Sequence, residues 1–185
     1  MRKIIFLDRD GVINRYPGDT KYVTTWRQFK FLPGVKTSIK RLNKAGYSIF
    51  IISNQAGVTK GIYAKKKLNL ITKNMLSEIK NHSGEIKKVF YCIHTSDDNC
   101  SCRKPRTGLI KEAFRSLGIR PKGADLKKIY FIGDTIRDIE TGHNANLKTI
   151  LVLSGKERIR NKKKWRILPD YVFRDLSSAV DFILS

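Results

Sequence analysis

The sequence lacks any apolar run that approaches the roughly 20 residues a membrane-spanning helix needs. Its start, Met1-Arg2-Lys3 followed by the apolar residues 4–7, is too short for a signal peptide, so we expect a cytoplasmic protein with no membrane partner. Cysteine is also scarce. The 185 residues include three cysteines, and this odd number, without a signal peptide, argues against a disulfide framework.

Acidic residues are few relative to basic ones. Sixteen Asp and Glu stand against 38 Lys and Arg, so the formal net charge is +22. A surface of this sign attracts phosphorylated metabolites and nucleic acids alike. The basic residues are scattered, and the sequence contains no aromatic-rich basic stripe or recognised nucleic-acid-binding motif. The charge therefore fits a generally basic surface at least as well as a nucleic-acid partner, which we do not expect.

What the sequence does contain is an alternation of short apolar runs and amphipathic segments. Five apolar runs predict strands buried on both faces, at residues 4–7, 48–52, 89–91, 129–132 and 149–153. Apolar stripes predict five helices, at residues 34–46, 68–79, 109–117, 136–141 and 176–184. This alternation predicts one α/β domain over residues 1–185, with a mostly parallel sheet between two layers of helices.

Polar residues follow each of the first four predicted strands. They are Asp8 and Asp10, Ser53-Asn54-Gln55, Cys92 and His94, and Asp134. Ligands of open α/β sheets bind beyond the carboxyl ends of the strands, so we expect these residues to converge on one site. Asp8 and Asp10 repel each other unless a cation intervenes, and Asp134 adds a third carboxylate, a set that favours magnesium. An Asp-x-Asp-Gly segment can also be a simple turn, but Asp134 makes that the weaker interpretation.

Four short motifs occur in order between residues 8 and 138. They are Asp-Arg-Asp-Gly-Val-Ile-Asn at 8–14, Ser-Asn-Gln at 53–55, Arg-Lys-Pro at 103–105, and Gly133-Asp134 with Asp138. In order and spacing they resemble the four motifs of the haloacid dehalogenase (HAD) superfamily. The resemblance implies a HAD-like, doubly wound, Rossmann-like parallel sheet and a phosphoric monoester hydrolase.

The resemblance also implies roles for the acidic residues. Asp8 would attack the phosphate ester and become transiently phosphorylated, which divides one difficult displacement into two easier ones. Asp10 would protonate the leaving alcohol and later activate water. Magnesium would bind the Asp8 carboxylate, the Asp10 backbone carbonyl and Asp134. Asp138 would support the metal site without binding the ion itself.

Two further residues would hold the phosphoryl oxygens in this resemblance, Ser53 through its hydroxyl and Lys104 through its charge. The short interval between the second predicted helix and Lys104 leaves no room for a separate cap domain. We expect the loop at residues 15–22 to border the pocket.

A second cluster consists of Cys92, His94, Cys100 and Cys102. Three thiolates and an imidazole can form a closed tetrahedral zinc site, which is structural rather than catalytic. The alternative is a set of free thiols around an exposed loop. The segment Asp97-Asp98-Asn99 favours the zinc site, because it is typical of a turn that brings the two pairs together. We therefore expect a small zinc-binding loop over residues 92–102.

Within the HAD superfamily, this cluster resembles those of two zinc-bearing groups. One comprises the D-glycero-D-manno-heptose-1,7-bisphosphate 7-phosphatases and the other the histidinol-phosphate phosphatase domains. The segment at residues 53–58 resembles the heptose group, which implies substrate contacts from Asn54, Gln55 and Arg103, with Arg103 meeting a second phosphate. Thr135 is a further expected substrate-binding residue by its position in this resemblance. It departs from that group, in which a lysine usually follows Gly-Asp, so one substrate-binding cation is missing.

These observations favour a small phosphorylated sugar as the substrate and a monomer as the active form. Histidinol phosphate remains an alternative substrate. A nucleic-acid 3′-phosphatase is a further alternative, since end-processing phosphatases share the Asp-x-Asp-Gly motif. A zinc-stabilised interaction module without catalysis is a third, and the complete set of Asp8, Asp10, Ser53, Lys104 and Asp134 argues against it.

Overall fold

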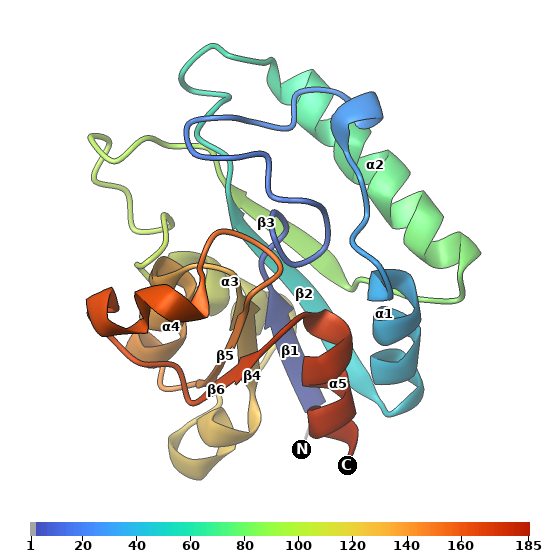
Figure 1. The fold of residues 1–185 in the computed structure, drawn as a ribbon, viewed down its shortest axis with the longest axis vertical. Helices are drawn as coiled ribbons and strands as arrows, with labels where there is room; N and C mark the ends of the chain where they lie inside the picture. Colours follow the sequence, from blue (N-terminus) through green and yellow to red (C-terminus); the bar gives the residue numbers. More distant parts are fainter. Residues whose placement is uncertain (1–2) are drawn as a thin grey trace.

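The computed structural model describes residues 3–185. Met1 and Arg2 lie outside the described residues. Both belong to the predicted domain 1–185 and to the N-terminal segment that was judged too short for a signal peptide. The described strands form one sheet of order β3-β2-β1-β4-β5-β6, and every neighbouring pair is parallel (Figure 1). The strands are β1 (Lys3–Leu7), β2 (Tyr47–Asn54), β3 (Lys88–Cys92), β4 (Tyr130–Gly133), β5 (Lys148–Val152) and β6 (Tyr171–Phe173).

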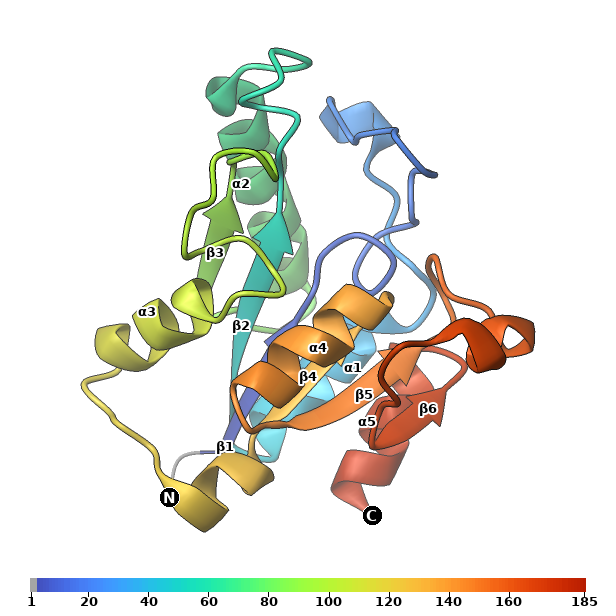
Figure 2. The same ribbon diagram turned by 90° about the vertical axis from the view of Figure 1, so that its left-hand side faces the viewer.

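Helices cover both faces of this sheet. They are α1 (Val35–Lys44), α2 (Lys65–Asn81), α3 (Gly108–Ser116), α4 (Ile136–Asn144) and α5 (Leu176–Leu184). Helices α1, α2 and α5 pack on one face, and α3 and α4 lie on the other, as Figures 1 and 2 show. Three short 3-10 helices complete the described elements: η1 (Trp26–Gln28), η2 (Gly123–Lys128) and η3 (Ile159–Lys164).

The central strand β1 shows why the strand sequences are continuous apolar runs. Ile5 and Leu7 join the core beneath α1, α2 and α5, whereas Ile4 and Phe6 join the core on the α3 side. Successive side chains of a strand point to opposite faces, so a sheet covered on both faces needs apolar residues at every position. Full burial of one such side chain stabilises the fold by ~1.5–3 kcal/mol.

The strand order also fixes where a ligand can bind. Strand β1 lies between β2 and β4. From β1 to β3 the strands are added on one side of β1, and from β4 to β6 they are added on the other side. In sheets of this kind, ligands bind beyond the carboxyl ends of the strands at the point where the order reverses. The carboxyl ends of β1, β2 and β4 therefore mark the expected position of the site.

The predicted α/β class, the five predicted strands and the five predicted helices are confirmed, with shifts of a few residues at their ends. Strand β6 was missed because it is a half-buried edge strand of three residues, too short to show a period. Between α2 and Lys104 the chain forms β3 and the cysteine-containing loop, and no element of residues 3–185 stands apart from the sheet as a cap. No helix in the described part of the chain is long and apolar enough to cross a membrane.

Candidate active site

The carboxyl ends of β1, β2 and β4 open into a cavity of about 370 Å³. Its walls include Asp8 and Asp10 from the loop after β1, Ser53 near the end of β2, and Asp134 directly after β4. Lys104 reaches the same cavity from the loop between β3 and α3. The structure therefore brings together the five residues for which the HAD resemblance implies the chemistry.

Lys104 is a buried cation between two carboxylates. Its Nζ lies 3.0 Å from Asp8 Oδ1 and donates to Asp138 Oδ1 at 2.5 Å. Burial alone would lower the pKa of Lys104, but the Asp138 and Asp8 carboxylates outweigh burial and raise the pKa to about 12. The side chain thus stays positively charged at neutral pH, beside the predicted nucleophile.

The backbone of Lys104 is held by Asn54. The Lys104 N–H donates to Asn54 Oδ1 at 3.1 Å, and Asn54 Nδ2 donates to the Lys104 carbonyl at 3.2 Å. Asn54 therefore acts on the site by positioning the lysine. Asn54 also lines the cavity, and its predicted contact with the substrate stays a prediction.

Replacing Asn54 by alanine is expected to lower kcat roughly ten- to a hundredfold while the protein stays folded. Losing both hydrogen bonds to the Lys104 backbone costs ~1–3 kcal/mol and lets the lysine drift from Asp8. The matched control is Asn144→Ala, since Asn144 donates one hydrogen bond to the neighbouring Pro105 carbonyl at 3.1 Å. Steady-state kinetics in which the two variants behave alike would contradict the positioning role.

Asp138 is fully occupied by protein partners. Its Oδ1 accepts from Lys104, and its Oδ2 accepts from the Thr135 N–H at 3.0 Å and the Thr135 hydroxyl at 2.6 Å. Thr135 and Asp138 together form the capping box that begins α4. Asp138 therefore orients Lys104, and its predicted support of the metal site stays a prediction. Thr135 lines the cavity, but its hydroxyl is engaged in the cap.

The buried carboxylates form a candidate cation site. Oxygens of Asp8, Asp134 and Asp138 all lie within 4.8 Å of one another. Burial is the largest cause that raises the pKa of Asp8 to about 6 and the pKa of Asp134 well above its usual range, and Asp138 adds to both. Among the described residues, Asp8 Oδ2 and Asp134 Oδ1 have no hydrogen-bond partner. A hard divalent cation fits this oxygen set and would offset the buried negative charge.

The chain packs against Asp134 so closely that two neighbours must be glycine. A Cβ built on Gly11 would lie 2.1 Å from Asp134 Oδ2, and one on Gly155 would lie 2.0 Å from the same oxygen. Gly11 also has a φ of +82°, which favours glycine. Gly11, the glycine of the first motif, therefore lets the loop after β1 pack against the Asp134 carboxylate.

The carboxylate of Asp10 is fixed by three side chains. The buried Arg9 donates from Nη2 to Asp10 Oδ2 at 3.0 Å, and Gln55 Nε2 donates to the same oxygen at 2.8 Å. Asn14 Nδ2 donates to Asp10 Oδ1 at 2.8 Å. Gln55 also accepts from the Tyr63 hydroxyl at 2.7 Å and lines the cavity, and its predicted contact with the substrate stays a prediction. No role was predicted for Arg9 or Asn14, although both lie within the first motif.

The loop at residues 15–22 borders the cavity, as predicted. On this loop Asp19 Oδ1 accepts from the Tyr16 hydroxyl at 2.5 Å and from Lys156 Nζ at 2.6 Å. The backbone N–H of Lys156 donates to Asp134 Oδ2 at 2.7 Å. The segment after β5 thus connects the loop to the buried carboxylates. A role for Lys156 was not predicted, because no motif marks that segment.

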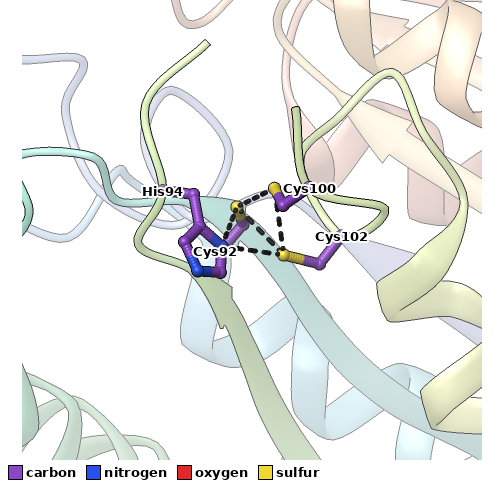
Figure 3. Close-up of side chains that lie close together, drawn as sticks. All are labelled: Cys92, His94, Cys100 and Cys102. Atoms are coloured by element: carbon purple, nitrogen blue, oxygen red, sulfur yellow. Dashed lines mark hydrogen bonds between the residues drawn. The ribbon is translucent and has the colours of Figure 1, made fainter. Parts of the chain in front are cut away.

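Figure 3 shows the side chains of Cys92, His94, Cys100 and Cys102 pointing toward one another. The sulfur–sulfur distances are 3.3–3.6 Å, and His94 Nδ1 lies 3.7 Å from Cys92 Sγ and 3.3 Å from Cys102 Sγ. Ligands of a tetrahedral zinc ion stand about 3.7 Å apart, given Zn–S bonds of about 2.3 Å. Burial raises the pKa of the Cys92 thiol to about 12, so a thiolate there needs a cation. Both the spacing and the chemistry fit zinc.

This cysteine cluster is linked to the active site through two arginines. Arg103 Nη1 donates to the His94 carbonyl at 2.9 Å, and Arg106 Nη1 donates to the Cys100 carbonyl at 2.6 Å. Lys104 lies between the two arginines in sequence. The geometry of the cluster therefore sets the path of the chain that delivers Lys104 to Asp8.

An aspartate pair, a third buried carboxylate and a buried lysine at the switch point of a parallel sheet define an α/β enzyme that handles phosphate groups. The sequence model of the HAD-hydrolase-like proteins matches residues 101–179. A D-glycero-beta-D-manno-heptose-1,7-bisphosphate 7-phosphatase of Pseudomonas aeruginosa is 31% identical over 99% of this chain and 98% of its own length. The alpha-named counterpart of Campylobacter jejuni is 32% identical over 84% of this chain and 85% of its own.

The crystal structure of a D,D-heptose 1,7-bisphosphate phosphatase from B. bronchiseptica, complexed with magnesium and phosphate, superimposes with a TM-score of 0.87. It shares 30% sequence identity and covers 98% of both chains. The chain belongs to the HAD-like phosphatase family that contains these enzymes. It is a phosphoric monoester hydrolase, and the predicted HAD-like fold is confirmed.

Proposed function

We propose that this enzyme removes the 7-phosphate of D-glycero-D-manno-heptose 1,7-bisphosphate through a phosphorylated Asp8, with magnesium as the catalytic metal. The observation that carries the proposal is the cluster of Asp8, Lys104 and Asp134 in one cavity, in a chain whose relatives bear the name of this activity. Relatives named for the beta and for the alpha anomer are similarly distant, so the proposal includes either anomer.

In the first step an oxygen of the Asp8 carboxylate attacks phosphorus, and the bond from phosphorus to the sugar oxygen breaks. Asp10 donates its proton to that leaving oxygen, so a neutral alcohol departs. In the second step Asp10, now a carboxylate, takes a proton from water as the water oxygen attacks phosphorus. The bond to Asp8 breaks, and inorganic phosphate and the free carboxylate result. Arg9 and Gln55 hold Asp10 in one orientation through both steps.

Two groups support the phosphoryl oxygens in this scheme. Lys104 supplies a permanent charge beside Asp8, and Ser53 supplies a hydroxyl at the end of β2. Magnesium, held by the Asp8 and Asp134 carboxylates and the Asp10 carbonyl, would neutralise charge on the transferring phosphoryl group. We infer that zinc is held by Cys92, His94, Cys100 and Cys102 and has a structural role.

Arg103 is the proposed contact for the second phosphate. It lines the cavity beside Lys104 and uses one nitrogen on the His94 carbonyl, so other N–H groups remain for an anion. Arg103→Ala is expected to lower kcat/KM for the heptose bisphosphate roughly ten- to a hundredfold, because an arginine–phosphate contact is worth ~1.5–3 kcal/mol. Hydrolysis of a simple monophosphate should change much less. The comparison is made by phosphate release at limiting substrate.

The same assay tests the alternative substrates. Histidinol phosphate carries a cationic amine, which a pocket rich in arginine and lysine disfavours. Wild-type enzyme should therefore prefer the heptose bisphosphate to histidinol phosphate and to DNA that carries a 3′-phosphate. If either of the other two esters gives the highest kcat/KM, the proposed substrate is wrong.

We also infer that residues 1–185 act as a single domain and as a monomer that needs no protein or nucleic-acid partner. The scattered distribution of its +22 charge supports general attraction of anions over one nucleic-acid site. Sedimentation at several protein concentrations tests the monomer directly.

A further inference from the structure

Six cationic side chains line the active-site cavity, and most of them already have a partner. The six are Lys21, Arg103, Lys104, Arg137, Lys156 and Arg166. Lys104 pairs with Asp8 and Asp138, Lys156 with Asp19, and Arg166 with Glu140. Arg103 donates to a backbone carbonyl. Of these six cavity-lining cations in the described part of the chain, only Arg137 and Lys21 have no side-chain hydrogen bond or ion pair.

Arg137 lies at the N-terminal end of α4, where a positively charged side chain is unfavourable for helix stability. It is the second residue of α4, at the end of the helix where the macrodipole is positive. Asp138 is the one acidic residue in the first turn, and both of its oxygens are engaged by Thr135 and Lys104. The Arg137 side chain is exposed and forms no ion pair with a carboxylate of the described residues. Local stability therefore gives no reason for an arginine at this position.

The neighbouring threonine does not supply a cation in its place. The Thr135 hydroxyl donates to Asp138 Oδ2 at 2.6 Å and accepts from the Asp138 N–H at 3.3 Å. Arg137 lies one residue beyond Ile136 on the same first turn and lines the same cavity. Its backbone is fixed by the helix, whose capping box also fixes Asp138 and, through it, Lys104. The backbone of Arg137 is thus fixed relative to Asp138 and Lys104, and its unpaired side chain lines the cavity from that position.

We propose that Arg137 determines specificity by binding a second anionic group of the substrate, a phosphate remote from the one that is cleaved. This inference rests on the proposed phosphatase function and adds a residue to the distal subsite alongside Arg103. A guanidinium offers paired N–H donors that match phosphate oxygens, and the positive end of α4 adds to the attraction. A ligand phosphate would supply the anion that the protein itself does not place beside Arg137.

The experiment measures a ratio in wild type, Arg137→Ala and Arg137→Lys. The ratio is kcat/KM for a sugar bisphosphate over kcat/KM for the sugar phosphate that lacks the second phosphate. It is taken for heptose 1,7-bisphosphate and, separately, for a hexose 1,6-bisphosphate. Arg160→Ala is the matched control, because Arg160 is an exposed arginine of η3 outside the cavity lining and its loss changes the net charge equally.

Arg137→Ala is expected to lower the ratio roughly ten- to a hundredfold. Arg137→Lys should recover part of it, and Arg160→Ala should leave it unchanged. The melting temperature of Arg137→Ala should equal or exceed that of wild type, because a cation leaves the positive helix end. An arginine with a merely structural role would instead lower the melting temperature and leave the ratio intact, which overturns the inference.

The remaining outcomes separate this inference from the proposed substrate. If wild type prefers the hexose bisphosphate and Arg137→Ala removes that preference, the heptose assignment fails and the role of Arg137 stands. If wild type prefers the heptose bisphosphate and Arg137→Ala keeps that preference, the role of Arg137 fails and the proposed function stands. If wild type favours neither bisphosphate over its monophosphate, both are wrong.

Discussion

Replacing Asp8 by asparagine is expected to lower kcat by several orders of magnitude, on the order of 10⁴-fold or more, with the fold intact. The amide cannot attack phosphorus, and no other carboxylate of the cluster can take its place. Asp134 packs against Gly11 and Gly155, and Asp138 is engaged by Lys104 and Thr135. The variant is compared with wild type by phosphate release and by thermal unfolding.

The fold should tolerate this change because Asp8 is costly to bury. Burial raises the pKa of Asp8 to about 6, so its charge costs more free energy here than in water, and Lys104 keeps Asp138 as a partner in the variant. Magnesium should raise the melting temperature of wild type and should do so less for Asp8→Asn, since one ligand is lost. Asp125→Asn, on the exposed 3-10 helix η2, is the matched control. Activity within tenfold of wild type in Asp8→Asn would remove Asp8 as the nucleophile.

Loss of the zinc cluster is expected to have the second-largest effect. Cys102→Ser should destabilise the protein by ~3–5 kcal/mol, a fraction of the roughly 10–16 kcal/mol by which structural zinc stabilises small zinc domains. It should also lower kcat, because Cys102 lies two residues before Lys104 and Arg103 is bonded to the His94 carbonyl. Both effects follow from one cause, the loosening of the loop that delivers Lys104 to Asp8.

Metal analysis should find about one zinc per chain in wild type and much less in Cys102→Ser. Ser101→Ala, between two of the ligands, is the matched control and should retain zinc, stability and activity. Wild type stripped of zinc by a chelator and then given magnesium should reproduce the defect of Cys102→Ser. Zinc-free protein with full activity and an unchanged melting temperature would show that the cluster has no structural role.

The convergence of Asp8, Ser53 and Asp134 could be predicted from the sequence because each follows a strand, and parallel strands end at one edge. Residue spacing alone likewise predicted that Cys92 and Cys102 belong to one cluster. The partner of Asn54 could not be predicted, since its hydrogen bonds join segments that are 50 residues apart in sequence. The contact between Asn54 and Lys104 depends on the path of the loop between β3 and α3, which the local sequence does not determine.

Arg137 and Lys156 were missed for a different reason. Arg137 lies between residues of the fourth motif without being one of them, and no motif marks the segment around Lys156, so in the sequence each is one basic residue among many. Whether such a residue lines the cavity depends on the direction of the first turn of α4 and on the path of the chain after β5. Strand β6 depends on tertiary context as well, because it pairs with β5 alone at the sheet edge.

The proposed covalent step is tested most directly by identifying the residue that carries the phosphoryl group. Wild-type enzyme is mixed with the heptose bisphosphate and magnesium, quenched in acid during turnover, and reduced with borohydride, which converts an aspartyl phosphate to homoserine. Peptide mass spectrometry should then find homoserine at position 8 and aspartate at positions 10 and 134. Turnover at full rate with unmodified aspartate at position 8, or homoserine at another position, would contradict nucleophilic attack by Asp8.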